Sequence, residues 1–177
     1  MKRFIAFVFV LVIACVSYGK SKEQTEMEKT LSAYVTTTAT NGFKVFKTIT
    51  LADEVKEEIE FQKWNLHWQQ SFYNEFKSLP GKHYQDLAED SRLKAIGFER
   101  TIKKLEDVEY MYPDLYNKVS FTIYKLAYWY KDSDGNEKCS QCYGKFNARD
   151  EMVAFRLTGS SDWVVIGSQC SIPGYKR

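Results

Sequence analysis

Three of the four cysteines are spaced in a way that could support chemistry. Cys139 and Cys142 are separated by two residues, and Cys170 lies near the end of the sequence. Such pairs serve redox reactions when a helix N-terminus lowers the thiol pKa, and they bind zinc when further ligands are close. This pair falls in a segment with the pattern of a strand, and nothing in the sequence places other ligands beside it. We therefore expect no catalytic residue, no metal and no cofactor.

A structural disulfide is the simpler use of these thiols in an exported protein. Strand residues three apart point to opposite faces, with Cα atoms about 10 Å apart, so a bond between Cys139 and Cys142 is disfavoured. The sequence predicts a bond from Cys170 to Cys142 or to Cys139, and it leaves that choice open.

Aromatic side chains form the second group of candidates. Trp64 and Trp68 flank His67 in a segment with helical spacing, where the imidazole could be a general base or a partly buried structural residue. Three tyrosines share one face of an expected strand, and apolar residues share the other. Either helices cover both faces, or an exposed patch binds a partner or an apolar ligand. The candidate binding surface comprises Trp64, His67, Trp68, Tyr124, Tyr128 and Tyr130.

The first nineteen residues have the layout of a bacterial export signal. Two basic residues precede an apolar run from Phe4 to Ala14, which is shorter than the about 20 residues that a membrane-spanning helix needs. The segment ending in Ala14-Cys15 resembles a lipobox, so cleavage before Cys15 would give a lipoprotein tethered to a membrane. Cleavage before Lys20 would give a periplasmic or secreted protein. We expect a signal over 1–19 and one domain over 20–177.

Charge excludes one class of partner. Loss of residues 1–19 would leave 23 basic and 23 acidic residues, so the remaining domain would be formally neutral. Nucleic-acid-binding domains carry a clustered basic excess, whereas the charges here are interspersed. We therefore expect no nucleic-acid partner.

The elements that must position these residues follow from hydrophobic spacing. A capping box at Ser21 opens a helix that Asn41-Gly42 would end, and a strand follows over 43–50. Two long helices are expected over 53–79 and from after Gly81 to about 112, packed as an antiparallel hairpin. One stripe of large side chains marks the first: Phe61, Trp64, Trp68, Phe72, Phe76 and Leu79. The buried side of the second would comprise Leu87, Phe98, Ile102, Leu105 and Val108.

The last third of the chain changes to the period of two that marks strands. Strands are expected over 119–131, 137–148, 152–157 and 163–167, joined by turns such as Asp134-Gly135. The predicted fold class is α+β, with an N-terminal helix, one strand, a long helical hairpin, and then a strand meander that forms a four- to five-stranded antiparallel sheet.

This order of elements carries a resemblance at the level of pattern. With Tyr128, Gly135, Phe146 and Val153 in a meander after a helical region, residues 22–167 resemble small secreted proteins of Bacteroidetes with cystatin-like or nuclear-transport-factor-like α+β folds. Such folds host enzymes, ligand binders, inhibitors and assembly domains, so the resemblance implies a fold and leaves the function open. Enzymatic members place an Asp, His or Tyr in a cone-shaped pocket, and no residue here maps to that role.

These observations favour an exported, envelope-associated binding or accessory protein, with an envelope protein as partner and no evident catalytic centre. One alternative is a small-molecule binder or enzyme with a pocket between sheet and helices, in which His67 or a strand tyrosine acts as acid or base. Another is a periplasmic inhibitor or immunity-type protein. The sequence does not separate the three, because each needs only a neutral, exported, aromatic-rich domain.

Overall fold

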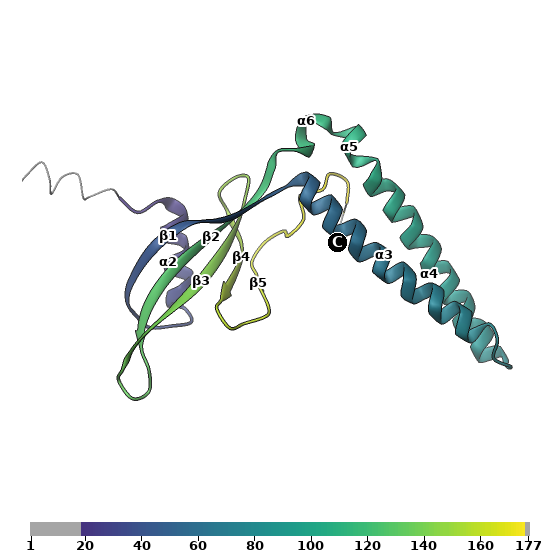
Figure 1. The fold of residues 1–177 in the computed structure, drawn as a ribbon, viewed down its shortest axis with the longest axis horizontal. Coiled ribbons are helices and arrows are strands. Elements are labelled where there is room, and N and C mark those ends of the chain that lie inside the picture. The colour runs from purple at the N-terminus through teal and green to yellow at the C-terminus, as the bar shows by residue number, and fades with distance from the viewer. Residues whose placement is uncertain (1–18, 176–177) are drawn as a thin grey trace, which may run out of the picture.

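The computed structural model describes residues 19–175, so Cys15 and the rest of the expected signal up to residue 18 lie outside the described residues. One helix packs on a five-stranded antiparallel sheet, and a long helical hairpin projects from that sheet (Figure 1). This arrangement confirms the α+β fold class and the order of elements. Within the described part of the chain, no helix has both the length and the apolar character that crossing a membrane requires.

The strands lie in the sheet in the order of the chain, and each neighbouring pair is antiparallel. They are β1 (Thr37–Thr50), β2 (Val119–Lys131), β3 (Glu137–Asn147), β4 (Met152–Leu157) and β5 (Val164–Val165). The helical hairpin is inserted between β1 and β2, which pair with each other although they are distant in sequence.

The first helix is shorter and the first strand longer than the sequence indicated. α2 (Lys22–Ser32) ends well before Asn41-Gly42, which lies inside β1 at a register shift against β2. Gly42 has φ 65°, a conformation that favours glycine. The left-handed residue that we expected to end a helix therefore forms a bulge in a strand.

α2 covers one face of the sheet. Its Met27 and Leu31 are fully buried in a core that includes Leu126, Phe146 and Phe155. A Cβ at Gly144 would lie 2.9 Å from Met27 Cγ, so this close packing of helix on sheet depends on glycine.

The hairpin consists of α3 (Leu51–Phe76) and α4 (Lys82–Glu106). A capping box joins β1 directly to α3, because the Asp53 amide donates to the Thr50 hydroxyl at 3.2 Å and the Asp53 carboxylate accepts from the Thr50 amide at 2.8 Å. Two short helices, α5 (Val108–Met111) and α6 (Pro113–Tyr116), return the chain to the sheet. Both helices of the hairpin extend away from the sheet (Figure 1).

A second core holds the base of the hairpin. Leu51 and Val55 of α3 pack with Leu105, Val108 and Ile172, the last of which comes from the C-terminal segment after β5. The hairpin is thus anchored at its base, while its outer part stands clear of the sheet (Figure 1).

Candidate functional site

The cysteines do not form one site. Cys142 is fully buried under α2, whereas Cys170 lines a cavity on the opposite side of the sheet. Cys139 is exposed, and it lies six strand positions from Lys145, which borders that cavity, so about 20 Å of strand separates the two. No disulfide joins the three described cysteines, so neither expected bond to Cys170 is present in the structure.

The candidate binding surface is also divided. Tyr124, Tyr128 and Tyr130 face α2, where Tyr128 is 4% exposed and belongs to the core, and the Tyr124 ring stacks on Phe43 at 4.9 Å. Trp64, His67 and Trp68 lie instead on α3, and all three are exposed. The tyrosines therefore contribute to packing on α2, and among the residues of this candidate surface Trp64, His67 and Trp68 are the exposed ones.

The large side chains of α3 form a continuous aromatic ridge on the outside of the hairpin. The ridge comprises Trp64, Trp68, Phe72 and Phe76 of α3 with Tyr84 of α4. Successive ring centroids lie 5.9, 6.0, 6.1 and 6.4 Å apart, each within the range of aromatic contacts. Trp64 is 58% exposed and Trp68 43% exposed.

The contact between the two helices is formed by small residues in the outer half of α4 and by larger apolar residues toward the base. The buried positions of α4 are Ala88, Ser91, Ala95, Ile102 and Leu105, and together with the half-buried Phe98 they recur at the alternating three- and four-residue spacing of a coiled-coil seam. Of the expected buried side, Ile102, Leu105 and Val108 are buried, and Leu87 and Phe98 are half-buried. In the outer half of the hairpin, the buried side chains of α4 are small, whereas Trp64, Trp68 and Phe72 of α3 are exposed. This distribution is the reverse of an ordinary amphipathic hairpin.

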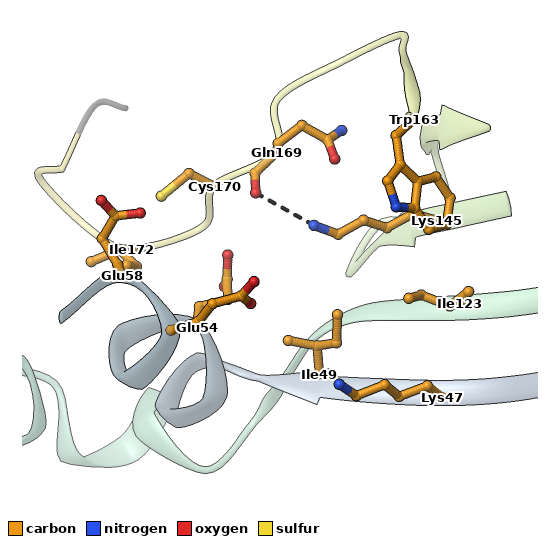
Figure 2. A pocket seen from close by; sticks show the side chains of 11 residues that line it. Lys47, Ile49, Glu54, Glu58, Ile123, Lys145, Trp163, Gln169, Cys170 and Ile172 are labelled. Carbon is orange, nitrogen blue, oxygen red and sulfur yellow. Dashed lines mark hydrogen bonds between the residues drawn. The ribbon is translucent and has the colours of Figure 1, made fainter. Parts of the chain in front are cut away.

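The other candidate site is a cavity of about 340 Å³ at the base of the hairpin (Figure 2). It lies between α3, the face of the sheet opposite α2, and the C-terminal segment. Lys145 extends into it from β3, where its Nζ donates to the Gln169 carbonyl at 3.5 Å and lies 3.9 Å from the centre of the Phe121 ring. Glu54 and Glu58 form the helical wall, and Trp163 closes the side nearest β5.

The two buried carboxylates of this cavity hold the C-terminal segment in place. Glu54 accepts hydrogen bonds from the amide of Ser171, at 3.1 Å, and from its hydroxyl. Glu58 accepts from the hydroxyl of Tyr175 and from Nε2 of Gln62, both at 2.7 Å. Burial, and then the bond to Glu58, raises the pKa of Tyr175 to about 12, so the phenol stays a donor at neutral pH.

These contacts indicate a structural role for the carboxylates rather than acid–base chemistry. Neither His67 nor a strand tyrosine, the two acid–base candidates that the sequence offered for a pocket between sheet and helices, lines this cavity. Among residues 19–175, no three His, Cys, Asp or Glu side chains are grouped so that they could hold a metal ion.

Comparison of the chain with protein-family models, with curated proteins and with solved structures finds no match. The resemblance to secreted Bacteroidetes proteins therefore stays a prediction, and the interpretation of function depends on the geometry of the chain itself.

Sequence reasoning placed Trp64 and Trp68 in the candidate binding surface, but it did not extend that surface along the stripe to Phe72 and Phe76. The signal was present in α4, where small residues at positions 88, 91 and 95 fit a seam that has no room for indole rings. Sequence reasoning also missed the contacts of Glu54 and Glu58 with the C-terminal segment, because more than 110 residues separate the partners.

Proposed function

We propose that this chain is a noncatalytic binding or accessory protein of the cell envelope, and that its projecting hairpin contacts a protein partner through the aromatic ridge. The observation that supports this function is the reversed distribution of side chains on the hairpin. Exposed aromatic surface has an unfavourable hydration free energy, which a partner that covers the ridge would remove. Trp and Tyr are also the residues that contribute most to protein interfaces.

The export signal expected from the sequence of residues 1–19 supports the cellular location in this proposal. Cleavage before Cys15 would place the hairpin on a tethered lipoprotein, and cleavage before Lys20 would release the domain into the periplasm or medium. Either form would bring the ridge to other envelope proteins.

A photo-crosslinking residue tests this function directly. We would place p-benzoylphenylalanine at Phe72, within the ridge, and at Tyr110, which is 90% exposed and lies outside it. Irradiated cells should yield a discrete covalent adduct from position 72, and adding Trp68→Gln should reduce its yield. Equal adducts at both positions, or none at position 72, would contradict the proposal.

The cavity at the base of the hairpin favours small-molecule binding as a second candidate function. Its volume is within the range of about 300–1,000 Å³ that ligand pockets occupy, and its lining combines lysines, carboxylates and an indole. One observation argues against small-molecule binding, because Glu54 and Glu58 already accept hydrogen bonds from the C-terminal segment of the chain itself. Lys145→Met would abolish saturable binding of a small ligand if the cavity were the functional site, and would leave a ridge-mediated contact intact.

A further inference from the structure

A row of positively charged side chains crosses the sheet on the face opposite α2. The row consists of residues that are paired directly across four neighbouring strands: Lys44 of β1, Lys125 of β2, Tyr143 of β3 and Arg156 of β4. Directly paired residues of antiparallel strands point to the same face, so three cations and one phenol lie side by side. Gly144, which follows Tyr143, packs against α2, and this places the row on the other face of the sheet. We call these four residues the cationic row.

Two like charges face each other within this row. The Cβ atoms of a directly opposite pair such as Lys44 and Lys125 lie about 5 Å apart, and like charges at such positions are destabilising. The same strand also shows the ordinary pattern, because its Lys131 is paired with Glu137 of β3. Among residues 19–175, no carboxylate forms an ion pair with Lys44, Lys125 or Arg156. An anion bound between the two lysines would remove their repulsion.

The neighbouring rows of this face do not carry the same excess of positive charge. The next row toward the turn between β2 and β3 is uncharged, and it comprises Asn41, Ala127 and Gln141. Toward the hairpin, the lysines at positions 47 and 145 line the cavity whose α3 wall carries three carboxylates. The excess of positive charge on this face is therefore localised at the cationic row.

Aromatic rings hold the arginine of the row in place. The guanidinium carbon of Arg156 lies 5.2 Å from the centre of the Tyr143 ring and 4.9 Å from that of Trp163. A guanidinium that stacks on rings keeps its N–H groups available for an anion, and its restricted motion lowers the entropy lost on binding. Phe46 contacts the Tyr143 ring edge-on at 5.1 Å and is 55% exposed, so an apolar surface lies beside the cations.

Charge balance indicates which anion fits. A phosphate monoester carries about 1.5 to 2 negative charges at neutral pH, so one such group neutralises both Lys44 and Lys125, whereas a carboxylate would neutralise only one of them. Its oxygens accept strong hydrogen bonds from ammonium and guanidinium groups. An extended acidic peptide fits less well, because β2 and β3 are paired on both edges and offer its backbone no hydrogen bonds.

We propose that the cationic row binds the phosphate monoester group of a small organic molecule. Lys44 and Lys125 neutralise the phosphate, Arg156 donates to its oxygens, and the organic part rests against Phe46. This site is separate from the aromatic ridge, so the proposal goes beyond the proposed function and does not depend on it.

Isothermal titration calorimetry with phenyl phosphate tests the site. Phenyl sulfate is the control ligand, because it has the same shape and a single negative charge, and ionic strength is held constant. The wild-type protein should bind phenyl phosphate saturably and at least about tenfold more tightly than phenyl sulfate. Lys125→Met and Arg156→Met should each weaken binding about tenfold. Lys131→Met, on the same strand and face, is the matched control and should leave the affinity unchanged.

The stability of Lys125→Met separates binding from a structural role. Without ligand, its thermal midpoint should equal or exceed that of the wild type, because the substitution removes a like-charge pair. A lower midpoint would show that Lys125 serves the fold, and would contradict the proposal.

The remaining outcomes distinguish other ligands. Equal affinity for phenyl sulfate and phenyl phosphate, or binding that is indifferent to Lys125→Met, would overturn the site. Inorganic phosphate that binds as tightly as phenyl phosphate would overturn an organic ester as the ligand. Binding to phosphatidic acid vesicles that saturating phenyl phosphate does not displace would identify a membrane surface instead. None of these results affects a crosslink from position 72, so the proposed function would stand if this site failed.

Discussion

At the scale of single residues, the structure distinguishes thiols that the sequence treated together. Cys139 is exposed near the end of a strand, and Cys142 is fully buried under α2. Burial alone raises the pKa of the Cys142 thiol to about 12. Because the thiolate is the reactive form, accessibility and ionisation both oppose reaction at Cys142.

Thiol labelling should therefore be strongly selective. Iodoacetamide at pH 8 should modify Cys139 at the rate of a solvated thiol and should modify Cys142 only as the domain unfolds. Peptide mass spectrometry with and without denaturant measures both rates. Rapid labelling of Cys142 in the folded protein would contradict the packing of α2 on the sheet.

The same burial predicts a dependence of stability on pH. The folded pKa of Cys142 is about 12, whereas an unfolded thiol has a pKa of about 8.5. The contribution is fully present below the unfolded pKa, and it is lost as pH rises between the two values because the unfolded chain releases the proton first.

We expect the free energy of unfolding to fall above about pH 8.5, and Cys142→Ala to flatten that fall. Because the pKa of Tyr175 is also raised, the free energy of unfolding of this variant should still fall with pH, but less steeply. Urea titrations from pH 7 to 11 measure the effect, with Cys139→Ala as the control. An unchanged slope in Cys142→Ala would show that the thiol does not titrate differently in the two states.

At the scale of elements, the C-terminal segment decides how the hairpin is held. Its Ser171 and Tyr175 donate to Glu54 and Glu58 of α3, and its Ile172 enters the core at the base. These contacts connect the loop after β5 to the first turns of α3, so the segment fixes the base of the hairpin beside the sheet.

Removing the hydroxyl of Tyr175 should loosen this anchor. Tyr175→Phe leaves Glu58 with one fewer donor and should cost about 1–2 kcal/mol of stability, since hydrogen bonds to charged groups are among the stronger ones. Amide hydrogen exchange should accelerate first in the opening turns of α3. Tyr110→Phe, which changes an exposed phenol, is the control and should leave the exchange rates unchanged. Amide exchange rates in α3 that are the same in Tyr175→Phe as in Tyr110→Phe would refute the anchoring role.

The sequence predicted elements better than it predicted their contacts. The hairpin helices, the turn at Asp134-Gly135 and the meander follow from local spacing, which depends on neighbours in the chain. Asn41-Gly42 was misassigned because a left-handed residue serves a helix end and a strand bulge equally well. The exposure of Trp64 and Trp68 depends on which face α4 covers, and an isolated stripe does not contain that information.

At the scale of the whole molecule, the fold separates a packed body from a projecting arm (Figure 1). The sheet and α2 bury Tyr128 in a core, and Tyr124 and Tyr130 pack against that core. The outer half of the hairpin instead encloses the small residues Ala88, Ser91 and Ala95 and exposes rings, so it contributes little core for its length. The binding function that we propose accounts for an arm of this composition.

Hydroxyl-radical footprinting of Trp64 and Trp68 tests the account most directly. The protein would be oxidised in intact cell envelopes and again as dilute purified protein, with Tyr110 as an internal control in both samples. The account predicts that both indoles are several-fold protected in the envelope and reactive in dilute solution, while Tyr110 reacts equally. Equal reactivity of the indoles in the two samples would show that nothing covers the aromatic ridge, and would contradict the binding function proposed for it.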